Sequence, residues 1–126
     1  MTNNNEEDED EGEDYEDEDC YVYVIGFANG IVKVGRSRNI RQRYRSHRSW
    51  ARTHGTSIAE VDVSLRYGTA APDERRLIRF CRDRWENLPG YAEHFVDADY
   101  EEVWTYFRAL EHMAAASGWL SEIPAA

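Results

Sequence analysis

The chain has 126 residues, a length that suits one small domain. No apolar run is long enough to span a membrane, and the N-terminal residues carry neither a positive region nor a hydrophobic stretch. We therefore expect no membrane partner and no secretory signal. The two cysteines are too few for a disulfide framework or a zinc site. These features favour a cytoplasmic protein with reduced thiols.

The net charge of −10 hides a separation of charges along the chain. Residues 1–19 hold 12 acidic residues and no Lys or Arg, whereas the rest of the chain holds 13 acidic residues and all 15 basic ones. No acidic residue lies between Cys20 and Ala59. The same interval contains a basic stripe of eight residues: Lys33, Arg36, Arg38, Arg41, Arg43, Arg45, Arg48 and Arg52. Phosphate is the commonest partner of such a stripe.

Residues 1–19 are predicted to be a disordered acidic tail. A segment this acidic, with Tyr15 as its one aromatic residue, cannot bury enough apolar surface to fold. Two roles fit such a tail. It solubilises the domain, or it lies over the basic stripe as a mimic of DNA and weakens non-specific binding. Residues 20–126 then form the folded domain.

The first two elements in chain order are strands. Residues 21–26 are rich in Tyr, Val and Ile, which favours a strand. The sequence Ala28-Asn29-Gly30 supplies turn chemistry, because Asn and Gly tolerate positive φ angles. Residues 31–35 form the return strand, so the two strands are predicted to pair as an antiparallel hairpin.

A helix is predicted from Ile40 to Thr53. Asn39 is a good N-cap for it, and Gly55 lies where a helix C-terminus favours a left-handed residue. Ile40, Tyr44 and Ala51 are expected on the face that packs on the sheet. The pair Arg43 and His47, four residues apart, is expected to project from a neighbouring face.

The second half of the chain predicts one strand and two helices. The strand covers residues 58–67, the first helix runs from Pro72 to about Asn87, and Leu88-Pro89-Gly90 ends it. The last helix covers residues 100–116 and turns five side chains inward: Val103, Trp104, Phe107, Leu110 and Met113. The order β-β-α-β-α-α predicts an α+β fold with a three-stranded antiparallel sheet flanked by helices.

Several short motifs follow one another in a distinctive order. Tyr21-Val22-Tyr23 and Lys33-Val34-Gly35 stand on the paired strands, Arg43 and His47 follow on the helix, and Glu74 stands at the start of the next helix. In this order the motifs resemble those of the GIY-YIG nuclease superfamily, over roughly residues 20–95. Tyr21 replaces the first Gly and Lys33 the second Tyr of the name motifs. Residues 90–95 resemble the Gly-x-x-Glu-x-Phe of a subgroup found in phages and bacteria.

The resemblance implies a divalent-metal-dependent DNA endonuclease, and it assigns a role to each motif residue. Hydrolysis of a phosphodiester needs an activated water, neutralised phosphoryl oxygens and help for the leaving oxygen. Glu74 would hold Mg²⁺ or Mn²⁺, and Arg43 would clamp the phosphate. Tyr23 would deprotonate or orient the water, with Lys33 or His47 assisting it or relaying the proton.

The same resemblance implies DNA as the partner, a second candidate for the metal ligand and a set of DNA-binding arginines. Glu93 is the rival carboxylate for the metal. The arginines around the motifs are expected to bind the backbone of DNA: Arg36, Arg38, Arg41, Arg45 and Arg48. So small a domain leaves little surface for base contacts, so we expect weak sequence preference or a structure-selective substrate. A monomer and a homodimer both stay open, since a dimer would cut both strands and a monomer would nick.

Simpler roles for the motif residues also stay open. Tyr23 could be an aromatic residue that packs within the strand, and Lys33 could be a charge at a strand edge. Arg43 and His47 could belong to a solvated helix face. Glu74 suits a carboxylate interacting with the helix dipole. The alternative function is therefore a catalytically inactive GIY-YIG-fold module that binds nucleic acid and carries an autoinhibitory acidic tail.

Overall fold

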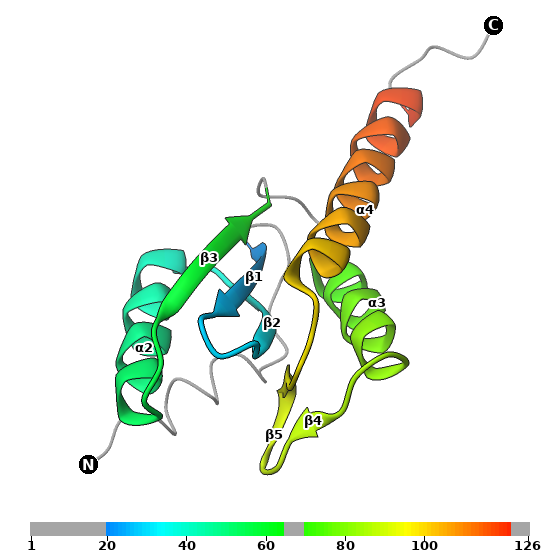
Figure 1. The fold of residues 1–126 in the computed structure, drawn as a ribbon. Coiled ribbons are helices and arrows are strands. Elements are labelled where there is room, and N and C mark those ends of the chain that lie inside the picture. The colour runs from blue at the N-terminus through cyan, green and yellow to red at the C-terminus, as the bar shows by residue number, and fades with distance from the viewer. Residues whose placement is uncertain (1–19, 65–69, 122–126) are drawn as a thin grey trace, which may run out of the picture.

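The centre of the fold is a five-stranded antiparallel sheet (Figure 1). The computed structural model describes residues 20–64 and 70–121. Its strands are β1 (Tyr21–Phe27), β2 (Val32–Ser37), β3 (Ile58–Val63), β4 (Asn87–Leu88) and β5 (Tyr91–Phe95), in the spatial order β3-β1-β2-β5-β4. The α+β class is confirmed, whereas the predicted three-stranded sheet is wrong.

The two extra strands lie where the sequence predicts a helix end and a loop. Helix α3 (Ala70–Arg82) ends five residues earlier than the predicted Asn87. The Pro89-Gly90 turn, with Gly90 at a φ of 88°, joins β4 to β5 as a tight hairpin. Strand β5 then pairs with β2, with Lys33 opposite His94. The hairpin thus adds two strands to the edge of the sheet formed by β2.

The helices cover both faces of the sheet. Helix α2 (Ile40–Thr53) lies on one face, and α3 with α4 (Tyr100–Ser121) lies on the other (Figure 1). The predicted caps of α2 are confirmed. The Asn39 side chain accepts a hydrogen bond from the Gln42 amide at 3.1 Å, and Gly55 has a φ of 72°.

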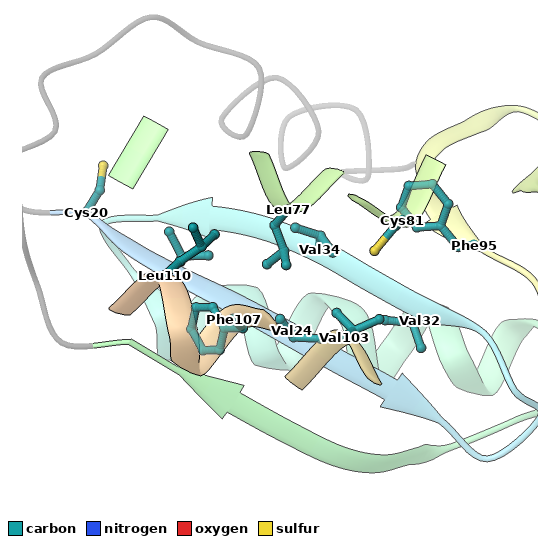
Figure 2. Close-up of a cluster of buried hydrophobic side chains, with 11 residues drawn as sticks. Cys20, Val24, Val32, Val34, Leu77, Cys81, Phe95, Val103, Phe107 and Leu110 are labelled. Carbon is teal, nitrogen blue, oxygen red and sulfur yellow. The ribbon is translucent and has the colours of Figure 1, made fainter. Parts of the chain in front are cut away.

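Strand alternation divides the apolar side chains between two cores. On the α3 and α4 side, eleven buried residues form one cluster (Figure 2): Cys20, Val22, Val24, Val32, Val34, Leu77, Cys81, Phe95, Val103, Phe107 and Leu110. On the α2 side, a smaller buried cluster contains Tyr23, Ile25, Phe27, Ile31 and Ala51. The second cluster leaves room for polar side chains between α2 and the sheet.

Helix α4 turns a narrower stripe inward than predicted. Val103, Phe107 and Leu110 are buried, but Trp104 is 40% and Met113 63% exposed. The helix contacts α3 and β1, and a single line of side chains at i, i+4 and i+7 fills that contact. None of the described helices has the length and apolarity needed to cross a bilayer. The predicted tail, residues 1–19, and the end of the predicted third strand, residues 65–67, lie outside the described residues.

Both thiols are predicted to be protected in the native protein. Cys20 and Cys81 are fully buried and neither forms a disulfide, and burial raises the pKa of the Cys81 thiol to about 12. An enclosed thiol is out of reach of iodoacetamide, and the raised pKa of Cys81 also keeps that thiol protonated. We therefore expect no labelling of either cysteine in the native protein between pH 7 and about pH 9, and labelling of both in urea, as read by mass spectrometry. Fast native labelling would contradict the burial of these positions.

Candidate functional site

The side chain of Tyr23, on β1, passes over Gly35 of the neighbouring strand β2. The two residues are direct partners in the antiparallel register of β1 and β2. A Cβ atom at Gly35 would come within 2.5 Å of the Tyr23 Cζ and Oη atoms. The missing side chain therefore lets the phenol ring pass over β2 toward helix α2, and any larger residue at 35 would push the ring away.

The Tyr23 hydroxyl forms a buried hydrogen bond with His47. A hydrogen bond of 2.9 Å joins Tyr23 Oη to His47 Nε2, and the two side chains are 1% and 7% exposed. Arg43, one turn earlier on α2, is 3% exposed. The helix thus buries Arg43, His47 and Ala51 against the sheet, so the expectation that the first two project from a neighbouring face is wrong. A solvated helix face is excluded for the same reason.

Lys33 belongs to the same polar cluster, where it is paired with a carboxylate from the missed strand. It lies two residues before Gly35 on β2 and so faces α2, and it is 2% exposed. Its Nζ donates to Glu93 Oε1 at 2.6 Å. The Glu93 side chain is 30% exposed, so this carboxylate forms the outer side of the pair. The simple strand-edge charge is therefore excluded for Lys33.

His94 also belongs to this cluster, although the sequence motifs do not include it. Its ring is 6% exposed and lies 6.2 Å from the His47 ring and 4.7 Å from the Trp50 ring. It is buried there because β5 pairs with β2 directly beside it. The signal in the sequence was the Pro89-Gly90 turn, which precedes a short strand-like run.

Glu74 lies on the other face of the sheet. Arg36 Nε donates to Glu74 Oε1 at 3.1 Å, and both side chains are 8% exposed. Gly35 faces Tyr23, so the next residue, Arg36, faces α3 and its core. The contact between Arg36 Nη1 and Cys20 Sγ, at 3.9 Å, confirms this direction. The structure therefore separates Glu74 from the cluster of Tyr23, Lys33, Arg43 and His47.

The surroundings of Glu74 do not fit the divalent cation expected from the sequence. Mg²⁺ keeps several waters and needs an accessible carboxylate, whereas Glu74 is 6% exposed and bonded to a guanidinium. Within residues 20–64 and 70–121, no group of three or more His, Cys, Asp or Glu side chains gathers to hold a metal. The metal expected at Glu74 stays a prediction, and the ion pair with Arg36 is the interaction that the structure shows for this carboxylate.

The arginines expected to bind nucleic acid divide into two groups. Arg36 is held in the buried ion pair and is not part of an accessible surface. The remaining four are exposed around the N-terminal half and outer face of α2: Arg38, Arg41, Arg45 and Arg48. No carboxylate belongs to helix α2, so these four present a positive surface next to the buried cluster.

The hydrogen bond between Tyr23 and His47 is predicted to contribute measurably to the free energy of unfolding. We expect Tyr23→Phe to lower the free energy of unfolding by about 1–2 kcal/mol, because it keeps the ring but removes one partner of a buried hydrogen bond. Urea unfolding measures this difference. The matched control is Tyr44→Phe, which removes a hydroxyl from a half-buried ring on α2 and should cost less than about 0.5 kcal/mol. Equal effects of the two variants would contradict the bond.

The Arg36 and Glu74 pair is predicted to be structural. Glu74→Ala should lower the free energy of unfolding by about 3–5 kcal/mol, because it removes the carboxylate that compensates the buried Arg36 charge. The charge-swapped variant Arg36→Glu/Glu74→Arg should recover part of that loss. Glu102→Ala is the control, since it breaks the exposed Arg84 and Glu102 pair and should cost less than about 1 kcal/mol. A Glu74→Ala protein as stable as the control would refute a structural pair.

No protein-family model matches the chain, and no curated protein or solved structure matches it either. The candidate site therefore depends on the geometry of its own side chains. That geometry joins Tyr23 to His47 on the α2 face, where Lys33 and Arg43 are buried as well and Glu93 and His94 lie beside them. Glu74 lies on the opposite face.

Proposed function

We propose that the chain is an endonuclease that hydrolyses phosphodiester bonds of DNA at the cluster between α2 and the sheet. The observation that carries the proposal is the buried hydrogen bond between Tyr23 and His47 beside Arg43 and Lys33. Buried charges and polar pairs cost stability, and proteins retain such costs mainly at functional sites. The order of these residues along the chain also resembles the motifs of the GIY-YIG superfamily.

Each side chain of the cluster has a defined part in this proposal. The Arg43 guanidinium offers a fixed fork of donors for two non-bridging phosphate oxygens. Tyr23 orients the attacking water, and His47, already bonded to the phenol, takes up or returns the proton. Lys33 adds a point charge that stabilises the negative charge developing on the phosphoryl group.

Glu93 forms the partly exposed side of the cluster. Its carboxylate is the partly exposed half of the pair with Lys33, whose own side chain is 3% exposed. A phosphate that binds Lys33 must therefore replace Glu93 as the partner of the ammonium group. The exposed arginines of α2, for example Arg45 and Arg48, would hold the neighbouring phosphates of the same strand.

A second function is favoured by one observation. All four cluster residues are at most 7% exposed, and Glu74 is held by Arg36 on the far side of the sheet. A buried polar cluster of this kind also suits a domain that binds nucleic acid through α2 and performs no chemistry. Such a binding module and the nuclease would both bind DNA, but only the nuclease would cleave it.

Cleavage of supercoiled plasmid separates the two functions. We expect the full chain to nick the plasmid, and Tyr23→Phe and Arg43→Lys to slow nicking by about 100-fold or more while both still bind DNA. Arms with Mg²⁺, Mn²⁺ and EDTA show whether a divalent cation takes part. Arg108→Ala, an exposed residue of α4, is the control and should cut like the parent.

Two outcomes would count against the nuclease. Binding of DNA without cutting under any metal condition would favour the binding module. Cutting by Tyr23→Phe and Arg43→Lys at the parent rate would show that the chemistry takes place elsewhere on the chain.

A further inference from the structure

A groove of about 520 Å³ lies between α3 and α4, away from the candidate active site. Four arginines and one carboxylate line it, together with Pro72 and two aromatic rings: Arg75, Arg76, Arg79, Arg84, Asp83, Phe80 and Tyr106. The arginines outnumber the carboxylate, so the lining carries a net positive charge. The opposite side of α3 carries Leu77 and Cys81, which are buried against the sheet. The groove therefore opens away from the sheet, on the face that does not carry α2.

Two of the four arginines are available to a ligand. Arg76 donates to Asp73 at 2.6 Å, and Arg84 donates to Glu102 at 3.1 Å. In the part of the chain that the structure describes, neither Arg75 nor Arg79 has an acidic partner, and both are exposed. Positions four apart lie about one helical turn, or about 5.4 Å, from each other on the same face. Their guanidinium groups can therefore hold one phosphate or two successive ones.

The walls of the groove are fixed before any ligand binds. The Phe80 and Tyr106 rings stack with their centroids 4.2 Å apart and their planes 9° from parallel. The Arg84 guanidinium lies 3.7 Å from the Phe80 centroid and also donates to the Phe80 carbonyl oxygen at 3.3 Å. These contacts hold the wall of the groove in place, so the wall itself loses little conformational entropy when a ligand binds to Arg75 and Arg79.

We propose that this groove is a second binding site for the phosphate backbone of DNA. The choice of DNA rests on the proposed function, while the anion-binding character rests on the arginines themselves, whose forks match phosphate oxygens. The site lies across the sheet from Tyr23 and His47, so it cannot hold the phosphate that reacts. It raises affinity and positions the nucleic acid, and it takes no part in the chemical step.

A pair of double variants of the full chain tests the groove. Arg75→Ala/Arg79→Ala removes the two available arginines, and Arg82→Ala/Arg108→Ala removes two exposed arginines outside the groove with the same change in net charge. Binding to a short labelled DNA duplex of mixed sequence is measured by fluorescence anisotropy at several salt concentrations. We expect the groove variant to bind about tenfold more weakly and its slope of log K against log salt to fall by about 1.8, or about 0.9 per lost phosphate contact.

The outcomes distinguish this proposal from the catalytic one. Equal losses in the two double variants would overturn the groove. Tighter binding of DNA by the groove variant would also overturn the proposal. It would indicate that Arg75 and Arg79 interact with the acidic residues 1–19 of the chain and not with DNA. A parent that binds DNA but does not cut leaves the affinity comparison intact, so the groove is then supported or overturned by that comparison alone. A parent without affinity for DNA would overturn both proposals.

Discussion

Tyr23 can bond to helix α2 because its partner on the adjacent strand, Gly35, has no side chain. This close approach links the hairpin register to the candidate site. A slip of one residue would move Tyr23 to the opposite face of the sheet and place a valine against His47. The turn at Asn29 and Gly30 fixes the register, through a φ of 90° at Gly30 and a 2.8 Å bond from the Phe27 amide to the Ile31 carbonyl oxygen.

The same alternation decides which charges lie together. Lys33 and Arg36 are three positions apart on β2, so they face opposite sides of the sheet. Each is buried, and each has a carboxylate from a different element, Glu93 of β5 or Glu74 of α3. An ion pair of this kind contributes less to stability than it costs when one partner is removed. Both pairs therefore act mainly as constraints on where β5 and α3 dock against β2.

Local sequence patterns predicted individual helices and turns better than they predicted which strands pair. The cap at Asn39 and the glycine at 55 are set by neighbouring residues, and the sequence alone identified them. Strand β5 is short and carries polar residues, and it exists because β2 offers an edge for pairing, which no local pattern records. Trp104 shares the apolar periodicity of α4, but its exposure depends on how few elements pack there. The motif residues of the hairpin and α2 lie together, as the sequence predicts, whereas Glu74 does not join them because its face depends on the docking of α3.

The basic side chains end in three environments, and their positions limit how one nucleic acid could use them. Lys33, Arg36 and Arg43 are buried, exposed arginines lie on and beside α2, and others line the groove between α3 and α4. The α2 surface and the groove are on opposite faces of the sheet, so a straight duplex cannot contact both. If both bind DNA, the duplex must bend around an edge of the domain or the two surfaces must hold separate segments. Bending a short site costs about 1–6 kcal/mol, which each added phosphate contact helps to offset. At moderate salt the field at each surface is set by charges within about 10 Å of it, so the net charge of −10 does not by itself decide whether DNA binds there.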